Sequence, residues 1–306
     1  MKKDFLKITD IDKKEIDALF QLTKDIKDKL KRGETYHPLK GNTLAMIFQK
    51  PSTRTRISFE TGMFQLGGHA LYISPSEMGF GTRESAADIG RVLSRYNDII
   101  MARLFGHDGI EELAKYSSVP VINGLTDLTH PCQILADAFT IIEHRGSLDG
   151  IKVTYVGDGN NVANSWLNFA AQYPLKLTIA VPKGYEPNAD MVANAQKNPV
   201  SEVEVVNDPF EGVKDADVIY TDVWASMGQE AEAESRKAIF KSYQVNDALV
   251  AAAKPGVLVM HCLPAHRGEE ITNSVIEGPH SIVFDEAENR LHVQKAIMVA
   301  LMEQSK

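Results

Sequence analysis

Short apolar runs separated by amphipathic, helix-like segments recur along the first half of the chain, and the same alternation starts again after Gly150. The first series has four strand candidates: Leu44–Phe48, Ala70–Ile73, Ile99–Ala102 and Val119–Ile122. The second has six: Val153–Val156, Leu177–Val181, Val203–Val206, Val218–Thr221, Val257–Met260 and Ile282–Phe284. Strands alternating with helices are typical of crossover units around a buried parallel sheet. The pattern therefore predicts an α/β fold with two doubly wound domains, each built on a mainly parallel sheet.

Two longer helices frame these series. Residues 11–32 carry apolar side chains at helical spacing, with Gly33 placed to end the helix, and residues 288–303 form a last helical segment. A chain of 306 residues fits two domains at roughly 100–200 residues each. We place the boundary at the break around Gly146–Gly150. The predicted domains are residues 1–147, joined by the helix 288–306, and residues 148–287.

Composition narrows the function classes. A net charge of -8 argues against a general binder of nucleic acid or anionic membranes, so any anion must be bound by a local basic site. The first ten residues lack the apolar core of a signal peptide, and no apolar run approaches the ~20 residues that cross a bilayer. Only two cysteines occur, Cys132 and Cys262, which fits a reducing compartment. We expect a cytoplasmic enzyme with small-molecule substrates.

The segment Pro51–Arg56 (PSTRTR) follows a strand candidate and begins a helix. Ser and Thr are good N-caps, and the free backbone N–H groups of a helix start bind anions. Arginine adds a planar fork of donors that suits phosphate. A capped helix with two solvated arginines is the simpler interpretation, but two arginines and three hydroxyls together favour phosphate binding.

Two further polar clusters follow strand candidates in the first series. Arg103 comes directly after one strand, and His130-Pro131-Cys132-Gln133 lies beyond the next. Ligands of open α/β sheets bind at the carboxyl ends of the strands, so these clusters are expected to meet in one crevice. Thr55, Arg103 and His130 together would polarise a carbonyl oxygen.

The segment Gly157–Asn161 (GDGNN) follows a strand and invites a dinucleotide-binding interpretation. Val162 stands where the third glycine of that fingerprint belongs, and no acidic residue follows the next strand at Val181-Pro182. A tight turn that presents Asn161 to a ligand remains. The segment Asp222–Gly228 also follows a strand, and its carboxylate and hydroxyl could hold an amino group or form an ordinary turn.

The segment His261-Cys262-Leu263-Pro264 follows the run Val257–Met260. A cysteine at a strand end is commonly a small buried apolar residue. A Cys–His hydrolase lacks its Gly-framed nucleophile motif here, and the cysteines and histidines show no paired short spacing of the zinc kind. We therefore predict neither a metal nor a cofactor.

Taken together, Ser52–Arg56, His130–Gln133 and His261–Pro264 resemble, in order and separation, the motifs of the carbamoyltransferase family. Asp222–Gly228 is similar to the family's ornithine-specific loop. The resemblance extends along nearly the whole chain, through Asp285–Arg290. It implies two α/β domains bridged by helices, trimers or multiples of trimers with sites at subunit interfaces, and transfer of a carbamoyl group from carbamoyl phosphate to an amine.

The resemblance also implies residue roles. Phosphate would be held by Ser52, Thr53, Arg54 and Thr55. The carbamoyl group would be surrounded by Arg103, His130, Gln133 and the backbone carbonyl of Leu263, with Arg290 closing the anion site. Ornithine would be held by Asn161, Asp222, Ser226 and Met227, with Cys262 near the reacting amine. One departure stands out, since Gly79 occupies a position where many relatives carry a Gln or His that enters the neighbouring subunit's site.

Competing functions remain open within and beyond the family. Aspartate as acceptor would call for an added cation that Asp222–Gln229 lacks, and putrescine would leave Asp222 without an α-ammonium partner. Ornithine fits these motifs best, with acetylated or succinylated ornithine left as alternatives. A non-catalytic binding module on the same scaffold would have no need of Arg103 together with His130. A dehydrogenase is disfavoured by Val162.

Overall fold

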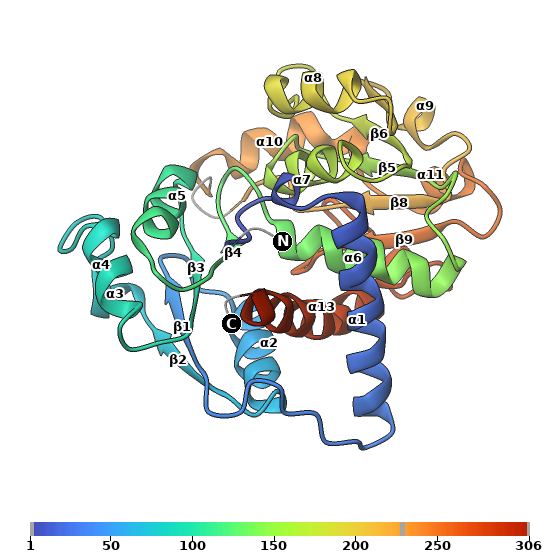
Figure 1. The fold of residues 1–306 in the computed structure, drawn as a ribbon. Coiled ribbons are helices and arrows are strands. Elements are labelled where there is room, and N and C mark those ends of the chain that lie inside the picture. Colours follow the sequence, from blue (N-terminus) through green and yellow to red (C-terminus); the bar gives the residue numbers. More distant parts are fainter. Residues whose placement is uncertain (1–2, 227–229, 305–306) are drawn as a thin grey trace. The chain divides into compact units, whose positions relative to one another are not determined.

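The computed structural model describes residues 3–226 and 230–304 and confirms an α/β fold with two parallel sheets (Figure 1). The chain divides into two compact units. Unit 1 runs up to Phe139 and resumes at Glu288, and unit 2 spans Thr140–Ala287. Both divisions fall inside a helix, α6 (Pro131–Arg145) and α13 (Val283–Gln304), so these helices continue from one unit into the other. The predicted boundary after residue 147 lies just beyond α6.

Unit 1 is built on a four-stranded parallel sheet in the order β2-β1-β3-β4. Its strands are β1 (Thr43–Phe48), β2 (His69–Ile73), β3 (Ile99–Arg103) and β4 (Val121–Leu125). Its helices, besides parts of α6 and α13, are η1 (Ile8–Asp10), α1 (Lys13–Lys31), α2 (Thr53–Gln65), α3 (Pro75–Met78), α4 (Ala86–Leu93) and α5 (His107–Tyr116). The predicted first helix is confirmed as α1, which Asp12 caps by accepting from the N–H of Glu15.

Unit 2 is built on a five-stranded parallel sheet in the order β7-β6-β5-β8-β9. Its strands are β5 (Lys152–Val156), β6 (Lys176–Ala180), β7 (Glu202–Val206), β8 (Val218–Thr221) and β9 (Leu258–His261). Its helices are α7 (Asn161–Ala170), α8 (Ala189–Lys197), α9 (Pro209–Val213), η2 (Glu230–Glu232), α10 (Ala233–Phe240), η3 (Lys241–Tyr243), α11 (Asp247–Ala251) and α12 (Asn273–Ile276).

The burial of the strands explains why the apolar runs were visible in the sequence. The central strands β3 and β8 are buried at every position, whereas the edge strands β2 and β7 alternate between exposed and half-buried residues. Central strands of a parallel sheet are covered on both faces and therefore read as continuous apolar runs. Each sheet has its own core, one around Ile47, Ile100 and Leu113 and the other around Ile219, Phe240 and Val259.

The strand order identifies one switch point in each sheet. In unit 1 the chain moves from β1 to β2 on one side and then places β3 on the other side of β1. In unit 2 the chain passes from β5 through β6 to β7 and then places β8 on the other side of β5. Helices that leave in opposite directions open a crevice at such a point, which is where ligands of this fold class bind.

One predicted strand is wrong. Residues 282–284 were expected to form a strand, but α13 begins at Val283, five residues before the predicted helix. Only Ser281 makes a bridge, to Val259. A three-residue apolar run does not distinguish a strand from a buried helix start. Asp285 and Glu286 follow at once and suit the positive end of a helix.

Candidate functional site

The switch point of unit 1 holds the predicted phosphate motif. β1 ends at Phe48, and α2 begins at Thr53 with Ser52 as its N-cap. The Oγ of Ser52 accepts from the backbone N–H of Thr55 at 3.3 Å and donates to the Oγ1 of Thr55 at 3.1 Å. A helix start carries partial positive charge and backbone donors that suit an anion. The predicted local geometry is therefore present at this turn.

Two buried arginines, Arg103 and Arg290, and the half-buried Arg54 place positive charge near His130. His130 precedes α6 and Arg103 ends β3, and both side chains are buried. Burial holds the pKa of His130 well below its usual value, and the charges of Arg290, Arg103 and Arg54 lower it further. The imidazole is therefore neutral near pH 7, so it can donate one hydrogen bond without adding a charge.

The second arginine of the motif is used differently. The guanidinium of Arg56 lies 4.0 Å from the ring centre of Tyr72 and pairs with Glu60 at 3.2 Å. These side chains line a surface depression of about 420 Å³ together with Pro51, Ser52, Thr53 and Ile57. Of the two arginines in the motif, Arg54 is the one whose charge reaches His130.

A chain of hydrogen bonds between side chains links three helices of unit 1. Arg290 of α13 donates through Nη1 to the Oε1 of Gln133 on α6, and through Nη2 to the Oε1 of Gln294 at 2.9 Å. Gln294 in turn donates to the Oγ of Ser58 on α2 at 2.7 Å. Gln133 also donates to Asp137 at 2.8 Å. These bonds hold Arg290 and Gln133 in fixed positions beside the start of α6.

The loop after α3 explains the departure at position 79. Gly79 ends α3 with φ +58, and a Cβ there would lie 2.8 Å from the Cβ of Arg83. A side chain at this position would therefore be strained by both backbone and contact. Arg83 is exposed, and within residues 3–226 and 230–304 no ion pair involves it. The nearby carboxylate of Asp88 pairs with Arg91 at 2.9 Å.

The switch point of unit 2 is centred on Asp222, which follows β8 and is buried. Its Oδ1 accepts from the Sγ of Cys262 at 3.0 Å, and its Oδ2 accepts from the Nδ2 of Asn160 at 2.7 Å. Asn160 caps α7 by accepting from the N–H groups of Val162 and Ala163. One carboxylate thus joins the carboxyl ends of β5, β8 and β9.

The electrostatics here are opposite to those of unit 1. Burial raises the pKa of Asp158 to about 6, although Arg236 at 3.1 Å acts to lower it. Burial also raises the pKa of Tyr155, and the charges of Asp222 and Asp158 raise it further. The negative charge of Asp222 and Asp158 therefore favours a positively charged group in a ligand bound here.

The segment after β9 is held by two buried carboxylates, those of Glu270 and Glu286. The Nδ1 of His261 accepts from the N–H of Leu263 at 2.9 Å, and its Nε2 lies 3.0 Å from the Oε1 of Glu270. Nε2 therefore carries the ring proton and donates a hydrogen bond to Glu270. Glu286 accepts from the N–H of His261 at 2.9 Å. Leu263 has φ +56, which turns its backbone sharply after Cys262.

Glycine at position 159 has a local reason. A Cβ there would lie 2.3 Å from the backbone nitrogen of Pro187. The close approach of the segment 185–187 therefore accounts for glycine at this position. Asn161 is the first residue of α7, and Ser226 is half-buried beyond Asp222. Met227 lies outside the described residues.

Three contributors were missed by the sequence analysis. Asn160 was detectable, because an Asn directly before a helical segment is a common N-cap. Gln294 and Glu270 carry no signal in the sequence, because Gln294 bonds to Ser58, 236 positions away, and Glu270 matters through its burial beside His261. Their roles follow from tertiary contacts alone.

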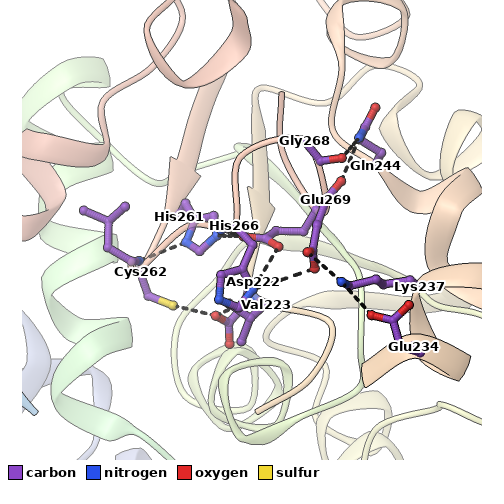
Figure 2. A network of polar contacts seen from close by, with 12 residues as sticks. Asp222, Val223, Glu234, Lys237, Gln244, His261, Cys262, His266, Gly268 and Glu269 are labelled. Carbon is purple, nitrogen blue, oxygen red and sulfur yellow. Dashed lines mark hydrogen bonds and ion pairs between the residues drawn. The ribbon is translucent and has the colours of Figure 1, made fainter. Parts of the chain in front are cut away.

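Two groups of described residues bring three metal-type ligand atoms within 4.8 Å: Asp222, His261 and Cys262, and His266, Glu269 and Glu270. In the first, Cys262 bonds to Asp222, and His261 is bonded through both ring nitrogens. In the second, Glu269 is paired with Lys237 at 3.1 Å (Figure 2). Both groups are already joined by hydrogen bonds and ion pairs of the protein itself. Among the described helices, none has the length and apolar character that a membrane crossing requires.

Comparison with known proteins places these features in a family. Residues 3–143 match the model of the aspartate/ornithine carbamoyltransferase carbamoyl-P binding domain, and residues 149–301 match that of the Asp/Orn binding domain. The chain is 54% identical over 302 residues to ornithine carbamoyltransferase of Syntrophus aciditrophicus, covering 99% of this chain and 100% of that protein. It is 55% identical to ornithine carbamoyltransferase of Geobacter metallireducens, again covering 99% of this chain and 100% of that protein.

A solved structure agrees with the sequence relatives. The ornithine carbamoyltransferase of Pyrococcus furiosus superimposes with a TM-score of 0.95 at 53% identity, covering 98% of this chain and 97% of that one.

Proposed function

This chain belongs to the aspartate/ornithine carbamoyltransferase family, and we propose that it transfers the carbamoyl group of carbamoyl phosphate to the side-chain amine of L-ornithine, releasing L-citrulline and phosphate. The observation that carries the proposal is the opposite charge of the two switch points. Arginines converge on a neutral His130 in unit 1, and carboxylates dominate around Asp222 in unit 2. The first suits a phosphate ester and the second suits an amino acid that brings ammonium groups.

Each donor at the first switch point has a role in this reaction. Ser52, Thr53, Arg54 and Thr55 bind the phosphate at the start of α2. Arg103 contacts both the phosphate and the carbamoyl oxygen, and His130 and Gln133 contact the carbamoyl group. Charge develops on the carbamoyl oxygen during attack, and preorganised donors of this kind stabilise it. Arg290 closes the anion site and holds Gln133.

The second switch point binds the acceptor. Asp222 is the counter-ion of the α-ammonium, with Asn161, Ser226 and Met227 completing the pocket. Cys262 lies near the reacting amine, and the backbone carbonyl of Leu263 accepts from the carbamoyl amide. The neutral amine attacks the carbamoyl carbon and loses a proton, and the carbon–oxygen bond to phosphate breaks. Positioning of the two substrates supplies much of the rate, since carbamoyl phosphate is already activated.

We assign residues 1–147 with 288–306 to the carbamoyl-phosphate domain and 148–287 to the ornithine domain. The two family models support this assignment, because they change over at residues 143–149. We further propose a cytoplasmic homotrimer or a multiple of trimers. Large exposed apolar side chains on unit 1, such as Phe64 at 77% and Ile57 at 55%, support burial against other subunits.

The neighbouring subunit is proposed to complete each phosphate site through Thr82 and Arg83. The exposed position of Arg83, with Gly79 unable to contribute a side chain, supports this role. Mixed trimers of the inactive variants Arg54→Ala and Arg83→Ala test it. Activity should return because some sites then combine an intact Arg54 with an intact Arg83. A fully active Arg83→Ala variant, or mixtures that stay inactive, would exclude the role.

A citrulline assay with a panel of acceptors tests the reaction itself. Ornithine should be carbamoylated in preference to N-acetylornithine, N-succinylornithine, putrescine and aspartate. Activity on another amine alone would reassign the substrate, and binding of both ligands without turnover would indicate a non-catalytic module. An absorbance change with nicotinamide nucleotides would indicate a dehydrogenase.

A further inference from the structure

We propose that Gln49 is a positioning residue, whose side-chain amide fixes the phosphate-binding turn to the loop of residues 79–84 and to the segment after β3. The inference rests on the proposed function, because it concerns the site that would hold carbamoyl phosphate. Gln49 follows the last residue of β1 and stands three residues before Ser52, the cap of α2. It is half-buried.

Gln49 makes three bonds to two other segments of unit 1. Its backbone N–H donates to the carbonyl of Arg103 at 2.9 Å. Its side-chain Oε1 accepts from the N–H of Phe105 at 3.0 Å, and its Nε2 donates to the carbonyl of Phe80 at 3.2 Å. One amide therefore satisfies a donor in one loop and an acceptor in another, which a purely accepting carboxylate cannot do.

The contacted segments are the ones that carry proposed site residues. Arg103 lies two residues before Phe105, and Thr82 and Arg83 lie two and three residues after Phe80. Phe80 itself packs on the core of unit 1 beside Gly109. The bond from Gln49 thus orients the start of an otherwise exposed loop.

Lys50 strengthens the same connection from the next position. Its side chain is 4% exposed, its Nζ pairs with Asp127, and it lies 4.4 Å from the ring centre of Phe105. Two successive residues therefore hold the turn that leads into Ser52. Lys50 acts through charge, whereas Gln49 acts through a directional pair of neutral hydrogen bonds.

The test uses inorganic phosphate binding to the full-length protein, measured by calorimetry without ornithine. Gln49→Leu removes both side-chain bonds at similar volume, and we expect phosphate affinity to fall roughly tenfold. Gln65→Leu is the control, because Gln65 accepts from the buried Lys295 at the far end of α2. It should lower thermal stability while phosphate affinity stays near that of the wild type. Wild-type affinity in a folded Gln49→Leu protein would overturn the inference.

Gln49→Glu separates positioning from mere stability. At pH 8 its carboxylate still accepts from Phe105 but repels the carbonyl of Phe80, so phosphate affinity should fall relative to the wild type. On acidification the carboxylic acid gains a donor and can restore the bond. The ratio of variant to wild-type affinity should therefore rise toward one as the pH is lowered through about 4.3, the ordinary pKa of a glutamic acid. A reduced ratio that does not change with pH would contradict the proposal.

The two proposals fail separately. Phosphate binding needs no turnover, so a wild-type protein that makes no citrulline yet shows the dependence on Gln49 would sink the proposed function alone. A wild type that makes citrulline, with phosphate affinity indifferent to position 49, would sink only this inference.

Discussion

The two sheets share one local arrangement at their switch points, but the charged side chains in it have opposite signs. At each switch point a strand ends, a polar residue caps the next helix, and a buried charged group lies at the end of the neighbouring strand. In unit 1 the cap is Ser52 and the neighbouring charge is Arg103. In unit 2 the cap is Asn160 and the neighbouring charge is Asp222. The side chains near the helix start, rather than the helix start itself, decide the charge of the ligand.

The caps also differ in how much they connect. Ser52 bonds to Thr55 within its own helix turn. Asn160 bonds to two backbone N–H groups, accepts from the hydroxyl of Tyr155 at 3.2 Å and donates to Asp222. Ser52 therefore acts within its own helix turn, whereas Asn160 also holds the carboxylate of Asp222 in place.

The largest expected effect comes from neutralising the acceptor site. Asp222→Asn removes the charge that would hold the α-ammonium and turns one accepting oxygen into a donor facing Asn160 or Cys262. Bonds to charged groups contribute ~1.5–3 kcal/mol each, so kcat/KM for ornithine should fall roughly a hundredfold. Steady-state kinetics with varied ornithine measure this. Asp215→Asn, an exposed carboxylate of the same unit, is the control and should change little.

A somewhat smaller loss is expected at the anion site. Arg54→Lys keeps the charge but not the bidentate fork, so kcat/KM for carbamoyl phosphate should fall roughly ten- to a hundredfold. The adjacent Arg56→Lys is the matched control, because Arg56 is engaged with Glu60 and Tyr72. Equal losses in both variants would show that the two arginines are not distinguished as the structure suggests.

Removing the caps should separate stability from binding. Loss of an N-cap costs about 0.5–2 kcal/mol of unfolding free energy. The loss of unfolding free energy in Asn160→Ala should lie at or above the upper end of this range, because the variant also loses the bonds to Tyr155 and Asp222. The loss in Ser52→Ala should lie near the middle of the range. Chemical denaturation measures both. The kinetic losses should also differ between the two variants. Asn160→Ala should lower kcat/KM for ornithine, whereas Ser52→Ala should lower kcat/KM for carbamoyl phosphate.

The last predictions concern the pH dependence of stability. In unit 1, burial and the charge of Lys295 lower the pKa of His292 to about 4. The unfolded chain then binds a proton that the folded chain does not, so His292 makes stability fall as pH drops from about 6.5 to 4. In unit 2, burial raises the pKa of Asp158 to about 6, so the folded chain binds the extra proton and stability rises as pH drops from about 6 to 4.

Variants should therefore change the acid dependence in opposite directions. His292→Gln should make the loss of unfolding free energy between pH 6.5 and 4 shallower, and Asp158→Asn should make it steeper. A single group changes the slope by at most about 1.4 kcal/mol per pH unit. Urea denaturation midpoints across that range provide the measurement, and shifts of the same sign would refute the assignment.

Much of this protein was determined by sequence alone. The buried central strands could be predicted because they appear in the sequence as continuous apolar runs. The order of strands and helices predicted parallel sheets. The caps, arginines and carboxylates after strand ends could be identified because they obey local rules of helix capping and strand position. The prediction of a strand at residues 282–284 was wrong, because three apolar residues show no periodicity that distinguishes a strand from a helix.

Only the tertiary structure decided which of these residues act together. Arg54 and Arg56 are two positions apart, yet the fold directs one charge toward His130 and stacks the other on Tyr72. Gln133 on α6 bonds to Arg290, 157 positions away on α13, and Arg290 in turn bonds to Gln294. The physical reason is that helix caps and strand patterns depend on neighbours along the chain, whereas burial, pKa shifts and buried hydrogen bonds depend on neighbours in space.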